Sequence, residues 1–285
     1  MRCRALLIAL VLSIAPTLAQ AAPALWEVSD ADSKVWLFGS IHVLPKTIVW
    51  RTPVFDDVLK QADQVYFEAD IGPMGQLGLI LTSLKMGFTQ HQDWLQTLTP
   101  DQSSKLMAAI TPLGMTGQQL GGYAPWLAEA MVENAVLQKL GYQADLGVDE
   151  TLQAELPKEK KGYFETAAGQ MQMLADAPED RQITRLMTTV DDVPNMPREI
   201  SDMARAWSSG NADSLAKSVT DDPTMDKGFT QTMVLDRNAR WAPVIEQMLA
   251  QNRQNLIVVG AGHLVGDGSV IDLLTKAGFT VQRIQ

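Results

Sequence analysis

The sequence predicts an α/β fold, with α+β as the alternative, in which one central mixed sheet is built from both ends of the chain. Segments rich in Val, Ile, Phe, Trp and Tyr, which is the composition of strands, occur near both ends of the 285 residues. The middle, from about residue 72 to residue 254, shows the apolar spacing of helices instead. We therefore expect a single domain over residues 22–285, whose sheet is covered by a large helical insertion.

Residues 1–21 have the pattern of a secretory signal peptide. A basic start precedes an apolar run from Ala5 to Ala15, and a small-x-small cleavage site ends at Ala21. The single cysteine, Cys3, lies in this segment, so the mature chain would contain neither disulfides nor thiolate sites. We expect cleavage near Ala21 and a periplasmic or secreted protein.

Three segments in the first part of the chain predict strands: "LWEVSD" (25–30), "KVWLFGSIHVL" (34–44) and "QVYFEADI" (64–71). Helices are predicted in the middle by five stretches, at 99–110, 123–141, 166–177, 196–210 and 230–251. The acidic runs "DAPEDRQ" and "DDVPNMP" between them are expected to be solvated loops.

The last 31 residues predict a strand, a helix and a second strand. The strands are "NLIVVGAGH" (255–263) and "FTVQRI" (279–284), and the helix between them ends at Gly278. This order predicts a parallel pair of strands. The apolar run "LIVV" suits a buried strand that is covered by helices on both faces.

The charge and hydropathy narrow the choice of partners. The formal net charge is −10 and no cluster of Lys and Arg stands out, so no nucleic acid is expected to bind. Beyond the signal peptide no stretch is long and apolar enough for a transmembrane helix. We therefore expect no stable membrane insertion after the signal is cleaved.

The glycine cluster "GAGHLVG" does not predict a nucleotide site. The dinucleotide fingerprint needs glycine at its sixth position, and Val265 stands there. The cluster matches another segment instead: Gly39 to His42 and Gly260 to His263 are both Gly-x-x-His sequences that follow an apolar strand. The carboxyl ends of strands are where ligands bind in an open α/β sheet.

A third strand end carries Glu68. Two imidazoles and a carboxylate from three strand ends can hold a divalent metal, so His42, Glu68 and His263 predict a site for Mn, Co, Zn or Fe. Without thiolate ligands such a site is of the catalytic kind. The alternative is that each histidine braces a turn by hydrogen bonding and that Glu68 pairs with an arginine.

The sequence resembles the TraB/GumN family, whose wider group also contains the Tiki metalloproteases and the pheromone-shutdown protein PrgY. The resemblance extends over nearly the whole mature chain, in order. It rests on the two Gly-x-x-His motifs, the glutamate between them, and the segments "GVDETL", "ETAAGQMQML" and "VLDRNARWAPVIEQML". It implies a single TraB/GumN-like domain with the activity of a divalent-metal-dependent hydrolase. The activity implied most concretely is that of a peptidase, with a peptide or small-molecule substrate.

Further roles are a hypothesis about mechanism. Arg237, which matches the arginine-containing segment of the family, would stabilise an oxyanion or hold a substrate carboxylate, and Glu165 and Asp149 are the candidates for a general base. The alternative for Arg237 is a helix-surface arginine paired with Asp236 or Glu246. The other matching residues are expected to support the site: Gly39, Gly260, Gly262 and Asn238.

Two readings compete with a hydrolase. A periplasmic binding or regulatory protein would keep the fold and the pocket without turnover, as the PrgY-like members suggest. A polysaccharide-acting enzyme has no support, because no pair of carboxylates can be placed at the separation found in glycosidases. The third histidine, His91, has no glycine pattern around it and is expected to be exposed.

Overall fold

The structure is a computed structural model that describes residues 21–88 and 93–285. Residues 1–20 of the predicted signal peptide and His91 lie outside the described residues. No helix within the described ranges is both long and apolar enough to cross a membrane.

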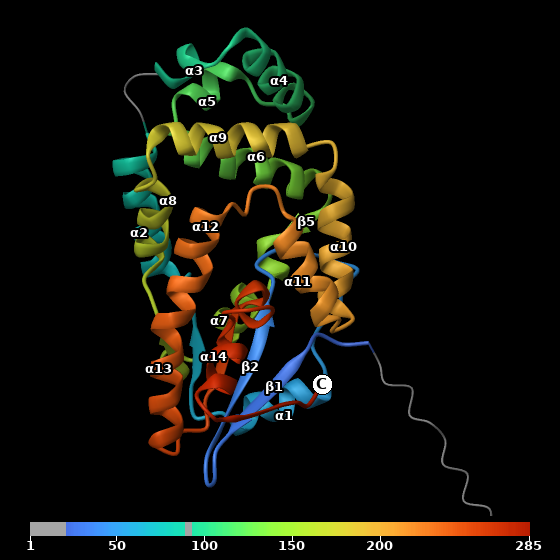
Figure 1. The fold of residues 1–285 in the computed structure, drawn as a ribbon, viewed down its shortest axis with the longest axis vertical. Helices are drawn as coiled ribbons and strands as arrows, with labels where there is room; N and C mark the ends of the chain where they lie inside the picture. Colours follow the sequence, from blue (N-terminus) through green and yellow to red (C-terminus); the bar gives the residue numbers. More distant parts are fainter. Residues whose placement is uncertain (1–20, 89–92) are drawn as a thin grey trace, which may run out of the picture.

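The described residues form strands, α-helices and shorter helical turns (Figure 1). The strands are β1 (Leu25–Ser29), β2 (Lys34–Ser40), β3 (Leu44–Pro45), β4 (Val65–Phe67), β5 (Tyr142–Gln143), β6 (Lys161–Tyr163), β7 (Leu256–Gly260) and β8 (Thr280–Arg283). The α-helices are α1 (Pro53–Gln61), α2 (Pro73–Thr82), α3 (Asp93–Thr97), α4 (Pro100–Ile110), α5 (Gly117–Gly121), α6 (Pro125–Lys139), α7 (Val148–Glu155), α8 (Ala167–Ala175), α9 (Glu179–Asp192), α10 (Met196–Ser208), α11 (Ala212–Asp221), α12 (Lys227–Thr230), α13 (Asp236–Ala250) and α14 (Val270–Lys276). Two π-helical segments, η1 (Ser83–Gly87) and η5 (Gln231–Leu235), and four 3₁₀ segments, η2 (Thr111–Leu113), η3 (Ala144–Leu146), η4 (Lys158–Lys160) and η6 (Ala261–Leu264), complete the set.

A six-stranded mixed sheet in the order β6-β4-β7-β2-β1-β8 confirms the predicted fold class. β6, β4, β7 and β2 are parallel, and β1 is antiparallel to both β2 and β8. Five of these strands come from the two ends of the chain, as predicted. The sixth, β6, comes from the middle and adds an edge that the sequence did not predict.

The predicted parallel pair at the C-terminus is wrong in one respect. β7 pairs with β2 and β4, whereas β8 pairs with β1 at the far edge, so the two strands are not neighbours. The physical reason is the β1–β2 hairpin, which Asp30 closes by accepting hydrogen bonds from the backbone N–H and the hydroxyl of Ser33. This hairpin occupies the position beside β7, and α14 carries the chain past it to the free edge of β1.

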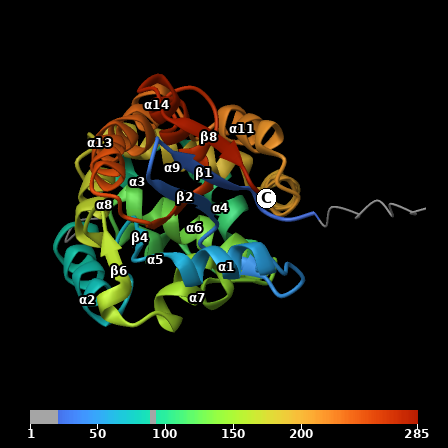
Figure 2. The same ribbon diagram turned by 90° about the horizontal axis from the view of Figure 1, so that it is seen from below.

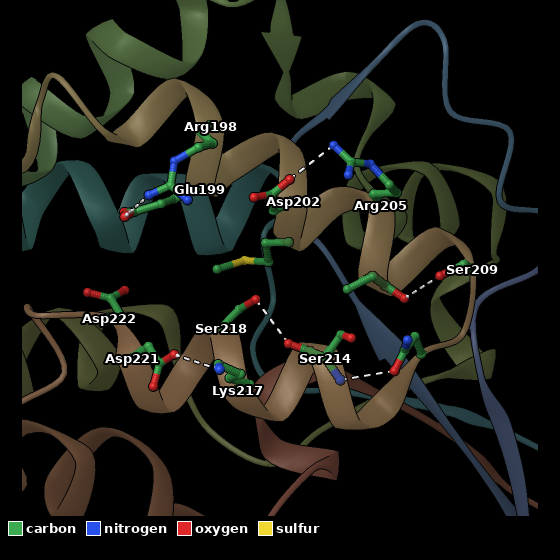
Figure 3. Close-up of a pocket in the computed structure, with 13 residues that line it drawn as sticks. Arg198, Glu199, Asp202, Arg205, Ser209, Ser214, Lys217, Ser218, Asp221 and Asp222 are labelled. Atoms are coloured by element: carbon green, nitrogen blue, oxygen red, sulfur yellow. Dashed lines mark hydrogen bonds and ion pairs between the residues drawn. The ribbon is translucent and has the colours of Figure 1, made fainter.

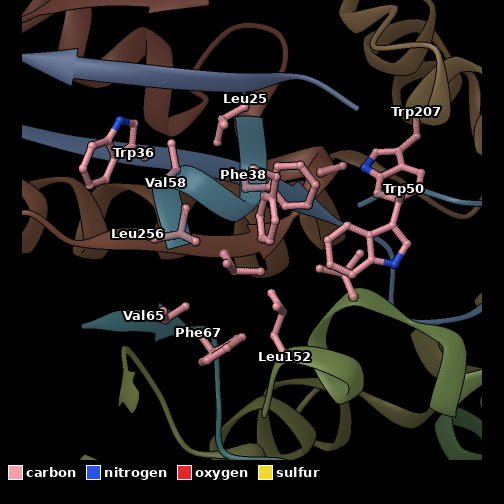
Figure 4. Packing of buried hydrophobic residues seen from close by; sticks show 14 of the residues in the cluster. Leu25, Trp36, Phe38, Trp50, Val58, Val65, Phe67, Leu152, Trp207 and Leu256 are labelled. Atoms are coloured by element: carbon pink, nitrogen blue, oxygen red, sulfur yellow. The ribbon is translucent and has the colours of Figure 1, made fainter. Parts of the chain in front are cut away.

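Helices cover both faces of the sheet, as Figure 2 shows from below. α13 and α14 lie on one face, where they bury alternate strand residues such as Leu37, Ile257 and Val259. On the other face Phe38 and Val258 pack against α1 and α7, with Trp50 and Trp207 at the end of the cluster (Figure 4). Both faces of the central strands are therefore buried, which explains the continuous apolar sequence of β7.

The helical middle of the chain forms an arch above the carboxyl ends of the parallel strands (Figure 1). It has a hydrophobic core of its own, formed by residues of α3, α4, α5, α6 and α9. The long helices α6 and α9 pack along each other at the top of the arch. The top of the arch and the sheet therefore have separate cores, while Trp207 of α10 and Leu215 of α11 join the side of the arch to the core of the sheet.

Candidate functional site

Three adjacent strands bring the candidate residues together. β4, β7 and β2 lie side by side, and Phe67, Val258 and Phe38 are matched across them. Because the strands are parallel and in register, the residues that follow them meet at one edge of the sheet. Glu68 follows β4 directly, and the two Gly-x-x-His segments begin in β2 and at the end of β7.

A cavity of about 460 Å³ lies between this edge and the helical arch. Its sheet side contains His42, Glu68, Arg237 and His263. The remaining lining residues are Ser40, Ile41, Val43, Glu133, Leu137, Tyr142, Met196, Ile200, Met203, Ala204, Leu215, Val219, Asp222, Met225, Val234, Gly260, Ala261 and Gly262. The structure therefore brings both predicted histidines and Glu68 to one cavity.

Glu68 is buried and hydrogen-bonded through both carboxylate oxygens. Oε1 accepts from the backbone N–H of Gly260 at 2.6 Å, and Oε2 accepts from Gln170 at 3.0 Å and from Arg237. Burial opposes ionisation, but it is outweighed by the charge of His263, which is protonated at the acidic pH where Glu68 titrates, and by the charges of Arg237 and His42, so the pKa of Glu68 is lowered to about 2. Glu68 is therefore a carboxylate throughout the physiological pH range.

Arg237 is 4% exposed and joins two carboxylates. Its Nε donates to Glu165 at 3.0 Å, and Nη2 donates to Glu68. Nη1 donates to the carbonyl of Met233 at 3.0 Å and lies 3.1 Å from Nε2 of His263. The alternative that Glu68 pairs with an arginine is therefore found in the structure.

The tautomer of His263 follows from its neighbours. A guanidinium has only donors, so Nε2 of His263 must accept from Arg237, and the ring proton must be on Nδ1. Nδ1 then donates to Oδ1 of Asn238 at 2.6 Å, and Nδ2 of Asn238 donates to the carbonyl of Gly268 at 2.9 Å. Burial is the main cause that lowers the pKa of His263 to about 4, so this ring is neutral.

His42 is held in the same way by a different partner. Its Nδ1 lies 2.8 Å from Oδ2 of Asp149, in the first turn of α7. The attraction of Asp149 is the main cause that raises the pKa of His42 to about 9. α7 approaches this segment closely, because a Cβ on Gly147 would collide with the carbonyl oxygen of His42.

The donor chemistry of these residues fits a divalent metal. Both histidines have Nδ1 fixed by an oxygen acceptor, which is the arrangement found in metal-ligating histidines that coordinate through Nε2. Glu68 adds the oxygen ligand that the prediction assigned to it. In the described residues, however, no three side chains of His, Asp or Glu are grouped closely enough to hold an ion. The guanidinium of Arg237 contacts both Glu68 and Nε2 of His263, so a metal would have to displace it from these atoms.

The other predicted residues lie around this set. Glu165 accepts from Arg237 and from the indole of Trp241 at 3.2 Å. Neither Glu165 nor Asp149 lines the cavity, so each contacts a residue of the site rather than the open space. The guanidinium of Arg237 also lies over the ring of Trp241, at 4.7 Å from its centroid.

The glycines of the two motifs have different surroundings. A Cβ on Gly39 would lie 2.9 Å from Cα of Ala261, so the two Gly-x-x-His segments pack against each other through this glycine. A Cβ on Gly260 would lie 3.1 Å from Oε1 of Glu68. At Gly262 the nearest atom is 3.6 Å away, which is an ordinary contact.

Four residues of the site were not predicted from the sequence. Gln170 donates to Glu68, and Gly147 makes room for the carbonyl of His42. Ser40 and Glu133 line the cavity. Ser40 lies inside the first motif and Gln170 inside "ETAAGQ", so the motif boundaries could have identified them; Glu133 has no such signal.

A second, polar groove of about 560 Å³ lies between α10 and α11 (Figure 3). Its charged residues pair within their own helices: Arg205 with Asp202 at 3.0 Å, and Lys217 with Asp221 at 3.9 Å. The groove contains neither histidine nor a buried carboxylate among its lining residues. The cavity at the strand ends is therefore the stronger candidate.

Comparisons with known proteins give the following matches. The model of the TraB/PrgY/gumN family matches residues 24–283. An uncharacterized protein of Treponema pallidum is 20% identical over 264 residues, which cover 88% of this chain and 80% of that protein. The uncharacterized protein YbaP of Escherichia coli is 25% identical over 244 residues, which cover 84% of this chain and 86% of YbaP. YbaP of Shigella flexneri matches to the same extent. No solved structure matches this chain.

Proposed function

The chain belongs to the TraB/PrgY/gumN family, and from this premise we propose that it is a divalent-metal-dependent hydrolase of peptides that acts in the periplasm or outside the cell. One arrangement carries the proposal. Two histidines from matching motifs, each with Nδ1 held by an oxygen, share a cavity with a buried carboxylate. An Nδ1 held by an oxygen is the arrangement that metal-ligating histidines show.

His42, His263 and Glu68 are the residues that would hold the metal. Mn, Co, Zn and Fe all accept imidazole and carboxylate ligands. A bound metal would supply Lewis acidity, which polarises a carbonyl group and acidifies water at neutral pH. Asp149 and Asn238 act as positioning residues here, because each fixes the ring orientation and the Nδ1 proton of one histidine.

Arg237 has one N–H left for a substrate oxygen. Of its five N–H groups, one donates to Glu165, two are directed to Met233 and His263, and one donates to Glu68. Because Arg237 lines the cavity, we infer that the fifth, the second N–H of Nη2, donates to a developing oxyanion or a carboxylate of the substrate. Glu165 holds the guanidinium in place and is therefore a positioning residue for Arg237.

The shape of the cavity suits a peptide. Its volume of about 460 Å³ lies within the range of small-molecule pockets and accommodates a few residues rather than a folded chain. Most of the lining contributed by the arch is apolar, including Leu137, Ile200 and Met203. Such a wall binds amino-acid side chains while the polar groups at the strand ends face the peptide backbone.

One observation favours a second function, a peptide-binding or regulatory protein without turnover. Arg237 already pairs with the negative charge of Glu68 and donates to Nε2 of His263, so neither residue needs a metal as a partner. In that case the histidines brace the two turns, and the cavity binds a peptide without cleaving it.

Metal analysis of the purified protein distinguishes the two functions. We expect one equivalent of a divalent metal after incubation with Mn, Co, Zn or Fe, measured by mass spectrometry after gel filtration. The double variant His42→Ala/His263→Ala should lose it. The matched control is His91→Ala, which removes the one histidine outside a Gly-x-x-His motif and should keep the metal.

Circular dichroism must show that every variant is folded before the metal contents are compared. A folded double variant that binds metal as tightly as the parent would contradict the proposed ligands. A parent that binds none of the four ions would favour the binding protein.

A further inference from the structure

The wall of the cavity that faces the strand ends is formed by the helical arch. The wall contains Glu133 and Leu137 of α6 and Ile200 and Met203 of α10. Asp222, which directly follows α11, is also part of it. In Figure 1 these helices lie above the end of β2. The wall is mostly apolar, and its two acidic residues carry no role in the proposed reaction.

Glu133 forms no ion pair with a described residue. One turn earlier on α6, Glu129 accepts from Arg185 at 2.8 Å and from Thr189 at 3.1 Å. Arg185 also donates to the carbonyl of Thr224, and its guanidinium lies 3.4 Å from the centroid of the Phe229 ring. Arg185, the cation whose charge acts on Glu133, is thus paired with other groups, and Glu133 forms no hydrogen bond or ion pair with any described residue.

Asp222 adds a second negative charge to the same wall. Its Oδ1 accepts from the backbone N–H and the hydroxyl of Thr224, at 2.8 and 2.6 Å. It forms no ion pair with a cation of the described chain. Burial, with the repulsion of Glu129 and Asp222 added and the attraction of Arg185 opposing, raises the pKa of Glu133 to about 7. A ligand that brings a positive charge would relieve this repulsion.

On the opposite side of the cavity, the hydroxyl of Ser40 is also without a partner. Ser40 is 2% exposed, and its Oγ makes no hydrogen bond within the part of the chain that the structure describes. It lines the same cavity and stands opposite Gly260 at the end of the sheet. A buried hydroxyl without a hydrogen-bond partner destabilises the folded protein, and a carbonyl oxygen of a ligand could accept the missing hydrogen bond.

We propose that the cavity recognises the free amino end of a peptide, whose ammonium group pairs with Glu133 beside Asp222 while Ser40 donates to a peptide carbonyl. The apolar side chain of the first residue then packs against Leu137, Ile200 and Met203. This assignment rests on the proposed function for the idea that peptides are the substrates. It goes beyond that function by assigning the amino end of the peptide to the cavity and Glu133 as the residue that recognises it.

The test is a binding measurement that needs no turnover. Isothermal titration calorimetry at pH 7.5 with EDTA compares leucyl-leucine amide with its N-acetylated form, which lacks the positive charge. The intact protein should bind the free amine at least about tenfold more tightly, because a charge-assisted hydrogen bond contributes that much. Glu133→Gln keeps the shape of the side chain and should reduce the preference to less than about twofold.

Two further variants sharpen the result. Asp221→Asn is the matched control: it removes a neighbouring acid that pairs with Lys217 and does not line the cavity, so the preference should remain tenfold. Ser40→Ala should lower the affinity for both peptides by the same factor, about threefold to tenfold, and leave the preference for the free amine unchanged.

Equal affinity for the two peptides, a preference that survives Glu133→Gln, or no binding of either peptide overturns the proposal. If Ser40→Ala leaves both affinities unchanged, the assignment of its hydroxyl is overturned. Because metal is excluded, an amine preference stands even if no hydrolysis is ever found. Conversely, metal-dependent hydrolysis without an amine preference would leave the proposed function intact and overturn this inference alone.

Discussion

The two Gly-x-x-His segments have the same spacing and the same position at a strand end, yet their histidines are in opposite states. The side chain of His42 is 65% exposed and is paired with a carboxylate, that of Asp149. The side chain of His263 is 8% exposed and is paired with a neutral amide, that of Asn238. The pKa is raised to about 9 in the first and lowered to about 4 in the second. A motif therefore fixes where an imidazole lies, while its surroundings set its charge: Asp149 does so for His42, and burial is the main cause for His263.

A further asymmetry is Arg237, which contacts Nε2 of His263. The structure records no comparable contact for Nε2 of His42 among the described residues. The two halves of the site therefore differ in rigidity: the His263 half is locked by a buried network, and the His42 half by a single hydrogen bond.

Removal of Arg237 should have the largest effect on stability. Arg237→Met leaves Glu68 and Glu165 buried without their shared cation, which should cost about 3–5 kcal/mol in the free energy of unfolding. Urea denaturation, with the midpoint and the slope fitted separately, measures this loss. In the same variant the pKa of His263 should rise, because the nearby positive charge that lowers it is gone.

Arg240→Met is the matched control for this experiment. Arg240 lies 3.4 Å from the same Glu165, but its side chain is 55% exposed, so its loss should cost less than about 1 kcal/mol. Similar losses in the two variants would show that Arg237 does not lock the His263 half of the site.

The next effect concerns the glycines that let the two motifs pack together. Gly39→Ala places a methyl group 2.9 Å from Cα of Ala261, and backbone atoms cannot move aside as a flexible side chain would. We expect a loss of about 1–3 kcal/mol in thermal or urea unfolding. Gly262→Ala meets nothing closer than Val219 at 3.6 Å, and its effect should stay within about 0.5 kcal/mol. The same cost at both positions would refute the idea that the close approach of Gly39 to Ala261 causes the loss.

Much of the fold could be predicted because strand composition and helical spacing are local signals. The five predicted helical stretches overlap α4, α6, α8, α10 and α13. The helix α9 was missed, since its start in "DAPEDRQ" was expected to be a solvated loop. Glu179 and Asp180 stand in the first turn of this helix, where negative charge stabilises the N-terminus. Acidic residues at a helix start and in a loop look alike in a sequence.

The site was predictable only where a repeated pattern marked it. Matching motifs identified His42 and His263, and the end of a strand identified Glu68. No spacing could show that α7 delivers Asp149 to the first histidine while α13 delivers Asn238 to the second, because these pairings depend on how distant elements pack. Glu133 is a single acid on an otherwise ordinary helix. Only the structure shows that it lines the cavity and forms no ion pair with a described residue.

A further prediction changes the residues that pair with the two histidines. Asp149→Asn removes the charge that is the main cause of the raised pKa, so His42 should titrate near its ordinary value of 6.5 instead of about 9. Conversely, Asn238→Asp should raise the pKa of His263 above about 4, since a carboxylate would then face its Nδ1 proton. Nuclear magnetic resonance titration of the histidine rings in EDTA-treated protein follows both. If His42 still titrates near 9 in Asp149→Asn, then Asp149 does not set its charge.

The raised pKa of His42 also predicts how the free energy of unfolding changes with pH. A histidine whose pKa is raised in the folded state stabilises the fold fully below pH 6.5, and this contribution is lost as the pH rises through about 9. The shift would correspond to roughly 3 kcal/mol for a buried pair, but His42 is well exposed, so about 1 kcal/mol is the expected loss after solvent screening. Unfolding free energies at pH 6 and pH 10 should therefore differ less in Asp149→Asn than in the parent, by about that amount. An unchanged difference would mean that the ion pair contributes nothing to folding, and that Asp149 serves only to orient the ring.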